Sequence, residues 1–157
     1  MDARLTPRLA PDRVLIAPSV TTKWELIDRL IEPMAAIEGL PSGAKEAVHE
    51  RESQVSTGLE AGIALPHGML RGDFATLGAL AILPSGLEFE AMDGLPARFV
   101  LAMLFPDSDA GRALHVTLLA SSLRLFTDEA LAESLMRAGD PAAALAALSD
   151  AEARLGV

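Results

Sequence analysis

The chain has 157 residues, of which 50% are hydrophobic and 22% are charged, and its formal net charge at pH 7 is −9. That length suits one sizeable core, so we expect a single domain over residues 1–157. The acidic balance, with its 13 Lys and Arg residues scattered along the chain, argues against a nucleic-acid-binding surface and against contact with an anionic membrane.

Further site classes are excluded by composition. No cysteine is present, which excludes disulfides, thiolate nucleophiles and cysteine-ligated metal sites. No apolar run reaches the roughly 20 residues that cross a bilayer, and the first residues lack the pattern of a secretory signal. We therefore expect a cytoplasmic protein without direct membrane insertion. One Trp, no Tyr and five Phe offer no aromatic platform for stacking bases or sugars.

The first third of the chain predicts a short strand and two helices. Residues 14–16 are apolar and form the strand. A helix begins near residues 21–22 with apolar side chains at helical spacing, and Pro33 kinks or ends it. Ser42 is the expected N-cap of the second helix, residues 44–54, which is polar on its outer side.

The next segment delivers a histidine from an apolar run. Residues 55–62 contain two glycines and two hydroxyl residues and predict a loop, which leads directly into a short strand at 63–65. Pro66 fixes φ before His67, and Gly68 is expected to let the backbone turn away without a Cβ clash. This arrangement aims an imidazole out of a rigid element, although a turn with an incidental histidine fits these residues as well.

The middle of the chain predicts the centre of a sheet. Residues 69–74 predict a loop, and residues 77–83 form a continuous apolar strand that ends at Pro84. Asp and Gly at 93–94 are typical of a hairpin turn, and residues 98–105 form a second apolar strand. Continuous apolar strands are buried on both faces, so both belong to the interior of the sheet.

The last third of the chain predicts three helices. Residues 110–126 repeat leucine at helical spacing. Thr127 is the expected cap of a second helix, residues 128–137. The last helix starts with Asp140 as its N-cap and Pro141 in its first turn, because proline suits that position.

The three histidines differ in their surroundings. His49 lies on a polar helix, which is typical of a solvated surface residue. His115 lies near the start of an apolar helix, where a core histidine with one satisfied hydrogen bond is the alternative to a functional role. A neutral imidazole at His67 can attack a phosphoryl group, and Arg51 can hold phosphoryl oxygens in a bidentate fork. A solvated helix arginine is the alternative for Arg51.

Two other kinds of site find little support. A serine hydrolase lacks its Gly-x-Ser-x-Gly motif in this chain. No pair of the three histidines has the spacing of a known zinc motif. We therefore expect neither a metal nor another cofactor.

Several short motifs occur together in this chain. They are Arg51-Glu52, Ser56-Thr57-Gly58-Leu59, Gly62-Ile63-Ala64-Leu65-Pro66-His67-Gly68, Gly86-Leu87, Phe89, Asp93-Gly94-Leu95-Pro96, Phe105-Pro106 and Leu114-His115. Together they resemble the IIA domain of the fructose/mannitol class of the bacterial phosphoenolpyruvate-dependent sugar phosphotransferase system, which includes the nitrogen-related IIA regulators. The resemblance covers roughly residues 5–150, nearly the whole chain, and implies that the core of the domain lies there. It implies an α/β (α+β) fold in which helices flank a central mixed β-sheet.

The resemblance also implies a role for individual residues. His67 matches the histidine that accepts phosphate from the phosphocarrier HPr, or its nitrogen-system counterpart, and passes it to a IIB domain. His115 matches the family's second active-site histidine, and Arg51 matches the arginine that borders the site. Phosphate-binding hydroxyl and backbone groups would come from Thr57, Gly58 and Gly62. Such a transfer requires no metal.

Two functions fit this resemblance. The first is a phosphohistidine carrier for sugar transport. The second is a nitrogen-related regulator in which the phosphorylation state of His67 switches binding to target proteins. The lack of a fused IIB or membrane domain favours the regulator, and a degenerate domain that binds partners without phosphorylation is a third alternative. In each case the acidic chain suits a basic-faced carrier.

Overall fold

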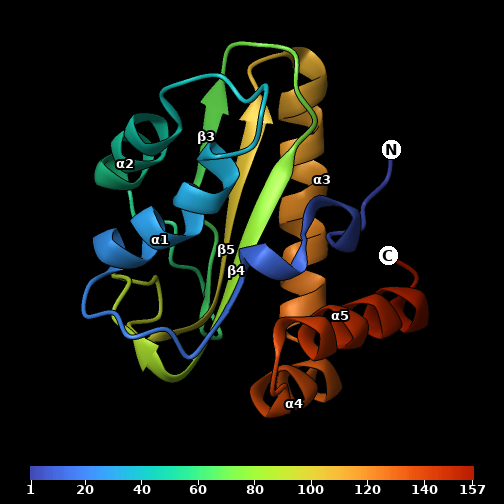
Figure 1. Ribbon diagram of the computed structural model, residues 1–157. Coiled ribbons are helices and arrows are strands. Elements are labelled where there is room, and N and C mark those ends of the chain that lie inside the picture. The colour runs from blue at the N-terminus through green and yellow to red at the C-terminus, as the bar shows by residue number, and fades with distance from the viewer.

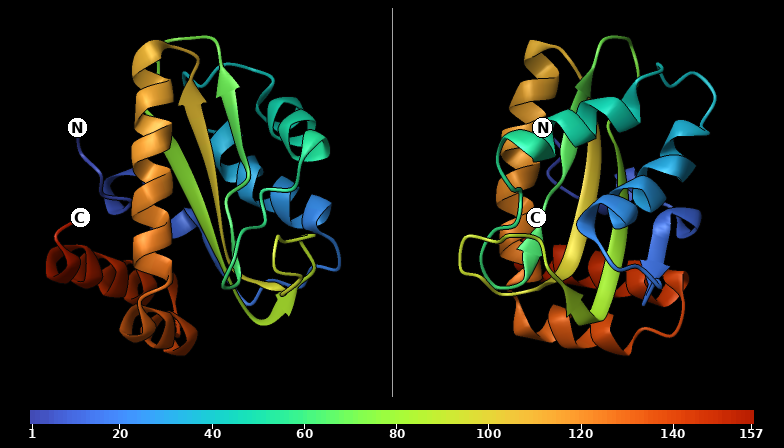
Figure 2. Two further views of the ribbon diagram at one scale, coloured as in Figure 1. Left: turned by 180° about the vertical axis from the view of Figure 1, so that it is seen from behind. Right: turned by 90° about the vertical axis from the view of Figure 1, so that its left-hand side faces the viewer.

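A five-stranded sheet separates two layers of helices (Figures 1 and 2). The structure is a computed structural model that describes residues 1–157. One face of the sheet is covered by α1 (Lys23–Ala35) and α2 (Ala44–Gln54), and the other by α3 (Asp109–Phe126), α4 (Glu129–Arg137) and α5 (Pro141–Leu155). The expected fold class, helices flanking a central sheet, is therefore confirmed.

The sheet is mixed because one of its strand pairs is antiparallel. Its strands are β1 (Val14–Ile16), β2 (Ile63–Ala64), β3 (His67–Leu70), β4 (Leu77–Leu87) and β5 (Ala97–Pro106). The order is β1-β4-β5-β2, with β3 also paired to β5. β4 and β5 are antiparallel, and all other pairs are parallel. Two short 3₁₀ turns, Thr6–Arg8 and Pro11–Arg13, precede β1.

Alternate residues of the central strands enter two separate cores. Leu101 and Met103 of β5 pack with α3, α4 and α5. Val100 and Leu104 point the other way and pack with α1 and α2. The two clusters hold 19 and 18 buried residues, so both faces are covered about equally. This agrees with the continuous apolar sequence of both central strands.

Two expectations for the strands were wrong. Residues 69 and 70 were expected to begin a loop at 69–74, but they belong to β3. They pair in parallel with β5, a distant partner that no local pattern reveals. β4 runs through Pro84 to Leu87 instead of ending at the proline. Its pairing with β5 is interrupted between Ile82 and Leu87, so the missing N–H of Pro84 costs no hydrogen bond of the ladder.

The helix ends match the predictions in part. Asp140 caps α5, as expected. α1 begins at Lys23 after its cap Thr22, which agrees with the expected start near residues 21–22. α1 continues past Pro33 and ends at Ala35. The other two predicted caps, Ser42 and Thr127, were wrong, since Gly43 and Asp128 occupy those positions.

The physical reasons differ between these two caps. Gly43 has a φ of 93°, a left-handed conformation that favours glycine. Asp128 accepts the backbone N–H of Leu131, whereas the Thr127 hydroxyl turns back to the carbonyl of Leu123 in α3. None of the helices combines the length and the apolarity that a membrane span requires.

Candidate functional site

His67 stands at the first position of β3, beside a break in the sheet edge. β2 ends at Ala64 and β3 begins at His67, so Leu65 lies in the break between the two strands. Nδ1 of His67 lies 3.0 Å from the carbonyl oxygen of Leu65. A carbonyl oxygen only accepts hydrogen bonds, so we assign the proton to Nδ1. The lone pair of the neutral ring is then on Nε2.

Gly68 serves a different purpose from the one expected. The backbone does not turn there, because Gly68 is the second residue of β3. A Cβ at this position would lie 3.0 Å from Cγ2 of Val48 and 3.1 Å from Cβ of Ala47, both in α2. Such spacing is tighter than most real contacts, so glycine permits α2 to lie directly on β3. This packing places the last turn of α2 near His67.

His115 lies on α3, which covers the face of the sheet opposite to α2. The centroids of the two imidazole rings lie 4.2 Å apart, with 36° between the ring planes. The ring of Phe105 meets the His115 ring edge-on at 5.1 Å. A residue of β5 thus supports the second imidazole, while the first lies on the neighbouring strand.

Both imidazoles have a lowered pKa. Burial is the main cause for His67, and the positive charge of Arg51 adds to it, while the Leu65 carbonyl and the Glu52 carboxylate act in the opposite direction. Burial also dominates for His115, followed by His67 and Arg51, and lowers its pKa to about 4. Both rings are therefore neutral at pH 7, the state in which an imidazole is a nucleophile.

Arg51 lies in the last turn of α2 and faces the two histidines. Its Nη1 donates a hydrogen bond of 2.7 Å to the carbonyl oxygen of Val55. Arg51, Thr57, His67 and His115 all line one cavity of about 140 Å³. A second cavity of about 240 Å³ also includes Arg51 and His67. The arginine and the imidazole are therefore accessible together from two directions.

The three residues expected to bind phosphate have different positions. Thr57 lines the cavity of His67, whereas Gly58 and Gly62 do not. A Cβ on Gly58 would lie 2.9 Å from Cα of Ala91, so this glycine permits close packing of two loops. Gly62 has a φ of 77°, and its carbonyl accepts two backbone N–H groups of β5. Both glycines shape the loop at a distance from the imidazole.

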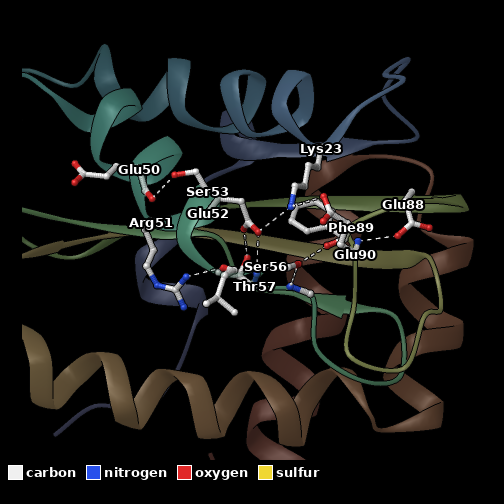
Figure 3. Close-up of polar contacts among 12 residues, drawn as sticks. Lys23, Glu50, Arg51, Glu52, Ser53, Ser56, Thr57, Glu88, Phe89 and Glu90 are labelled. Atoms are coloured by element: carbon white, nitrogen blue, oxygen red, sulfur yellow. Dashed lines mark hydrogen bonds and ion pairs between the residues drawn. The ribbon is translucent and has the colours of Figure 1, made fainter.

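Glu52 and Lys23 are both buried, and the sequence predicted a role for neither. Figure 3 shows how they connect to Thr57, which lines the cavity of His67. The Glu52 carboxylate accepts the backbone N–H of Thr57 at 2.8 Å and also accepts the Thr57 hydroxyl. Nζ of Lys23 lies 3.2 Å from the same carboxylate. One sequence signal was available: Ala44, Val48 and Glu52 recur every fourth residue, which places the glutamate on the buried face of α2.

His49 was expected to be a solvated surface residue, but it makes contacts within the protein. Its Nε2 lies 2.6 Å from a carboxylate oxygen of Asp28 in α1. Its ring lies 5.2 Å from the ring of Trp24. The residue is half-buried and connects the two helices of that layer, so it is a structural contact between α1 and α2.

Comparison with known proteins identifies the family. Residues 8–151 match the family described as phosphoenolpyruvate-dependent sugar phosphotransferase system, EIIA 2. The chain belongs to this family. As a IIA domain it has a phosphotransferase role, and its partners are other components of the phosphotransferase system.

Relatives of this IIA domain include both nitrogen regulatory proteins and components of sugar-specific phosphotransferase systems. The chain is 32% identical to a nitrogen regulatory protein of Bradyrhizobium diazoefficiens over 92% of its own length and 94% of that protein. It is 30% identical to the 2-O-alpha-mannosyl-D-glycerate-specific EIIABC component of Escherichia coli, covering 93% of the chain and 22% of that protein.

Solved structures show the same fold. The nitrogen regulatory protein IIA-Ntr of Neisseria meningitidis superimposes with a TM-score of 0.76 at 27% identity, over 91% of this chain and 97% of that chain. IIA mannitol of Escherichia coli superimposes with a TM-score of 0.69 at 22% identity, over 89% of this chain and 98% of that chain. The expected resemblance to IIA domains of the fructose/mannitol class, including the nitrogen-related members, is confirmed.

Proposed function

We propose that the chain is a single, cytoplasmic IIA domain that carries a phosphoryl group on Nε2 of His67. It accepts this group from HPr or its nitrogen-system counterpart and passes it to a IIB domain. The observation that carries the proposal is the pair of imidazoles, His67 and His115, meeting beside Arg51 at one cavity.

The hydrogen bond from Nδ1 to Leu65 supports Nε2 as the reacting nitrogen. In the proposed step the Nε2 lone pair attacks phosphorus while the phosphorus–nitrogen bond of the donor breaks. The electron pair of that bond stays on the donor's ring. The proton on Nδ1 of His67 remains in place, where the Leu65 carbonyl stabilises the positive charge that the ring acquires. Positioning and charge stabilisation are the main demands of such a transfer.

Arg51 and His115 stabilise the transferred group in this proposal. One guanidinium nitrogen of Arg51 is bound to Val55, which leaves other N–H groups for phosphoryl oxygens. His115 is neutral and can donate one ring N–H to the same oxygens. Thr57 supports the cavity wall, because both of its donors are bound to Glu52.

A phosphorylation experiment tests the proposal. The protein is incubated with phosphoenolpyruvate, enzyme I and the phosphocarrier. We expect one added phosphoryl group, stable in alkali, that mass spectrometry locates at residue 67. His67→Ala should abolish the label without unfolding the protein, because the side chain is only half-buried. An unlabelled wild type, or a His67→Ala variant that still takes up phosphate, would refute the proposal.

A second function, regulation, is favoured by one observation. The match to the Bradyrhizobium diazoefficiens nitrogen regulatory protein spans nearly the full length of both chains, whereas the chain covers 22% of the Escherichia coli EIIABC component. In this role the phosphorylation state of His67 switches binding to target proteins, because a phosphate adds charge and acceptors to the surface.

Transfer to a IIB domain separates the two functions. The phosphorylated chain is mixed with IIB domains from the same genome, and loss of label from His67 is followed over time. Rapid loss to a IIB domain supports the transport carrier. Retention of the label, together with target binding that differs between the phosphorylated and unphosphorylated forms, supports the regulator.

A further inference from the structure

One buried carboxylate has no part in the phosphoryl chemistry described above. The side chain of Glu52 has no solvent exposure, and it follows Arg51 directly in the last turn of α2. Burying an ionised carboxylate is costly unless it is paired and fully hydrogen-bonded. The partners of Glu52 therefore indicate its role.

Glu52 is bound on two sides (Figure 3). Toward the cavity it accepts both donors of Thr57, the backbone N–H at 2.8 Å and the hydroxyl. Away from the cavity it meets Nζ of Lys23 at 3.2 Å, and this ammonium also lies 3.3 Å from the exposed Glu90. Lys23 is itself buried, with 6% of its side chain exposed. The contact set joins α1, α2 and the turn that follows α2.

Arg51 and Glu52 hold the same turn at two points. Nη1 of Arg51 donates to the carbonyl oxygen of Val55, and Glu52 accepts the N–H of Thr57, two residues further on. The position of the Val55 carbonyl therefore depends on the bond between Glu52 and Thr57. A guanidinium held by a fixed carbonyl has fewer rotamers to lose when it binds a phosphoryl group.

We propose that Glu52 is the positioning residue for Arg51: it fixes the 55–57 turn, and the Val55 carbonyl of that turn orients the guanidinium toward His67. Glu52 touches neither the phosphoryl group nor the reacting nitrogen. Lys23 pairs with this carboxylate, both of whose oxygens accept hydrogen bonds from Thr57. This inference rests on the proposed function of Arg51 and goes beyond it by naming the group that orients the arginine.

A double-mutant cycle on transfer rate tests the proposal. Glu52→Gln keeps the shape of the side chain but replaces one acceptor oxygen with an NH₂ group, so Thr57 loses one of its two acceptors. Lys23 keeps Glu90 as a partner in this variant, which favours folding. We expect the rate of phosphoryl transfer to His67 to fall about tenfold, the scale of a modest misplacement of a stabilising group.

Glu52→Gln in an Arg51→Lys background distinguishes an effect on the orientation of Arg51 from a nonspecific disturbance of the site. Lysine lacks the planar fork, so there is no oriented guanidinium left to lose. We expect Glu52→Gln to change the transfer rate less than twofold there, whereas it should keep its tenfold effect in a His115→Gln background. Equal effects in the wild-type and Arg51→Lys backgrounds would overturn the proposal.

Substitutions of Thr57 provide a second route if Glu52→Gln folds poorly. Thr57→Val removes the hydroxyl donor and leaves the pair between Lys23 and Glu52 intact. Thr57→Ser keeps the hydroxyl. We expect a loss of about threefold for valine and near-wild-type transfer for serine, since one hydrogen bond is changed. Equal rates for the valine and serine variants would also overturn the proposal.

Glu152 offers a matched control elsewhere in the chain. It is a buried glutamate in α5 that accepts the N–H groups of Leu5 and Thr6 and the hydroxyl of Thr6. Glu152→Gln therefore removes the same chemistry from the N-terminal segment. We expect it to lower stability and leave the transfer rate unchanged.

A spectroscopic measurement keeps this proposal separate from the function on which it rests. In the unphosphorylated protein, the Nε–H resonance of Arg51 should be sharp and should broaden in Glu52→Gln. This measurement uses only the unphosphorylated protein, so it gives a result whether or not His67 accepts a phosphoryl group. An unlabelled wild type would refute the proposed function, whereas an unchanged Arg51 resonance in Glu52→Gln would refute the positioning role.

Discussion

The imidazole rings of His67 and His115 lie 4.2 Å apart although the two residues come from a sheet edge and from a helix on one of its faces. At this distance a positive charge on one ring disfavours protonation of the other ring. Burial and Arg51 act in the same direction, so both rings are neutral at pH 7. A neutral pair can offer a lone pair on one ring and a hydrogen-bond donor on the other.

Replacing His115 with glutamine tests the division of roles within this pair. Glutamine retains an N–H donor, but its amide does not reproduce the placement of the imidazole against Phe105 and His67. We expect His115→Gln to be phosphorylated on His67 about 10- to 100-fold more slowly, because one stabilising donor is misplaced. Rapid-quench labelling measures this rate. Label that moves from residue 67 to another site would contradict the assignment of His67 as acceptor.

Stability should decrease as the pH falls through the range set by His115. Its pKa is lowered from 6.5 to about 4 in the folded protein. Above pH 6.5 the His115 imidazole is neutral in both the folded protein and the unfolded chain, so its titration does not reduce the free energy of unfolding. Between pH 6.5 and 4 the unfolded chain binds a proton that the folded protein does not, so the free energy of unfolding falls. Partial solvent exposure of His115 reduces the effect to about 1 to 2 kcal/mol.

Urea denaturation at a series of pH values between 7.5 and 4.5 measures this decrease. His115→Gln serves as the reference, since glutamine does not titrate. Its stability should depend less steeply on pH over the same interval. An equally steep decrease in the reference protein would show that other groups cause it. His67 contributes with the same sign, because its pKa is also lowered.

Gly68→Ala tests the contact between α2 and β3. The new Cβ would lie 3.0 Å from Cγ2 of Val48 and 3.2 Å from the backbone N of the same residue. The backbone atom cannot move by a rotamer change, so α2 must shift. We expect a loss of about 1 to 3 kcal/mol of stability. We also expect slower transfer to His67, because α2 carries Arg51. Chemical denaturation and labelling measure the two effects.

Gly139→Ala is the matched control for this substitution. No atom lies within 4 Å of a Cβ at that position, and the backbone has no positive φ there. We expect unchanged or slightly increased stability, because alanine reduces the freedom of the unfolded chain. Similar losses for both variants would mean that the approach of α2 is not the cause.

Lys23→Met tests the buried ion pair. The substitution leaves the Glu52 carboxylate buried with the two Thr57 donors but without its ammonium partner. Removing one member of a buried pair typically costs about 3 kcal/mol or more, since the remaining charge is uncompensated. Thermal and urea denaturation measure the loss. The double variant Lys23→Met with Glu52→Gln should be more stable than Lys23→Met alone, and the opposite order would refute this explanation.

Local sequence patterns predicted the elements that local chemistry determines. The apolar runs of β4 and β5 were recognised because continuous hydrophobicity does not depend on partners. Thr22 and Asp140 cap helices by bonding to N–H groups within a few residues. His67 stood out because a proline and a glycine flank it, although the glycine proved to serve helix packing instead of a turn.

Local sequence patterns did not predict contacts between residues that are far apart in the sequence. β3 exists through parallel pairing with β5, more than thirty residues later in the chain. Lys23 and Glu52 pair across 29 positions, and each looks like an ordinary charged residue on a helix. The meeting of His67 with His115 depends on the strand, the helix and their packing at once. The motifs of the family supplied that relationship, whereas residue spacing did not.

The atom that sets the tautomer of His67 belongs to the main chain. An orienting side chain can be lost by a single mutation, as in sites where an aspartate or glutamine holds a histidine. The carbonyl of Leu65 is present whatever residue occupies position 65. Variation at that position can therefore reshape the cavity wall for a new partner while the same ring nitrogen keeps the lone pair. In evolutionary terms, the choice of the proposed reacting atom is separated from the choice of partner.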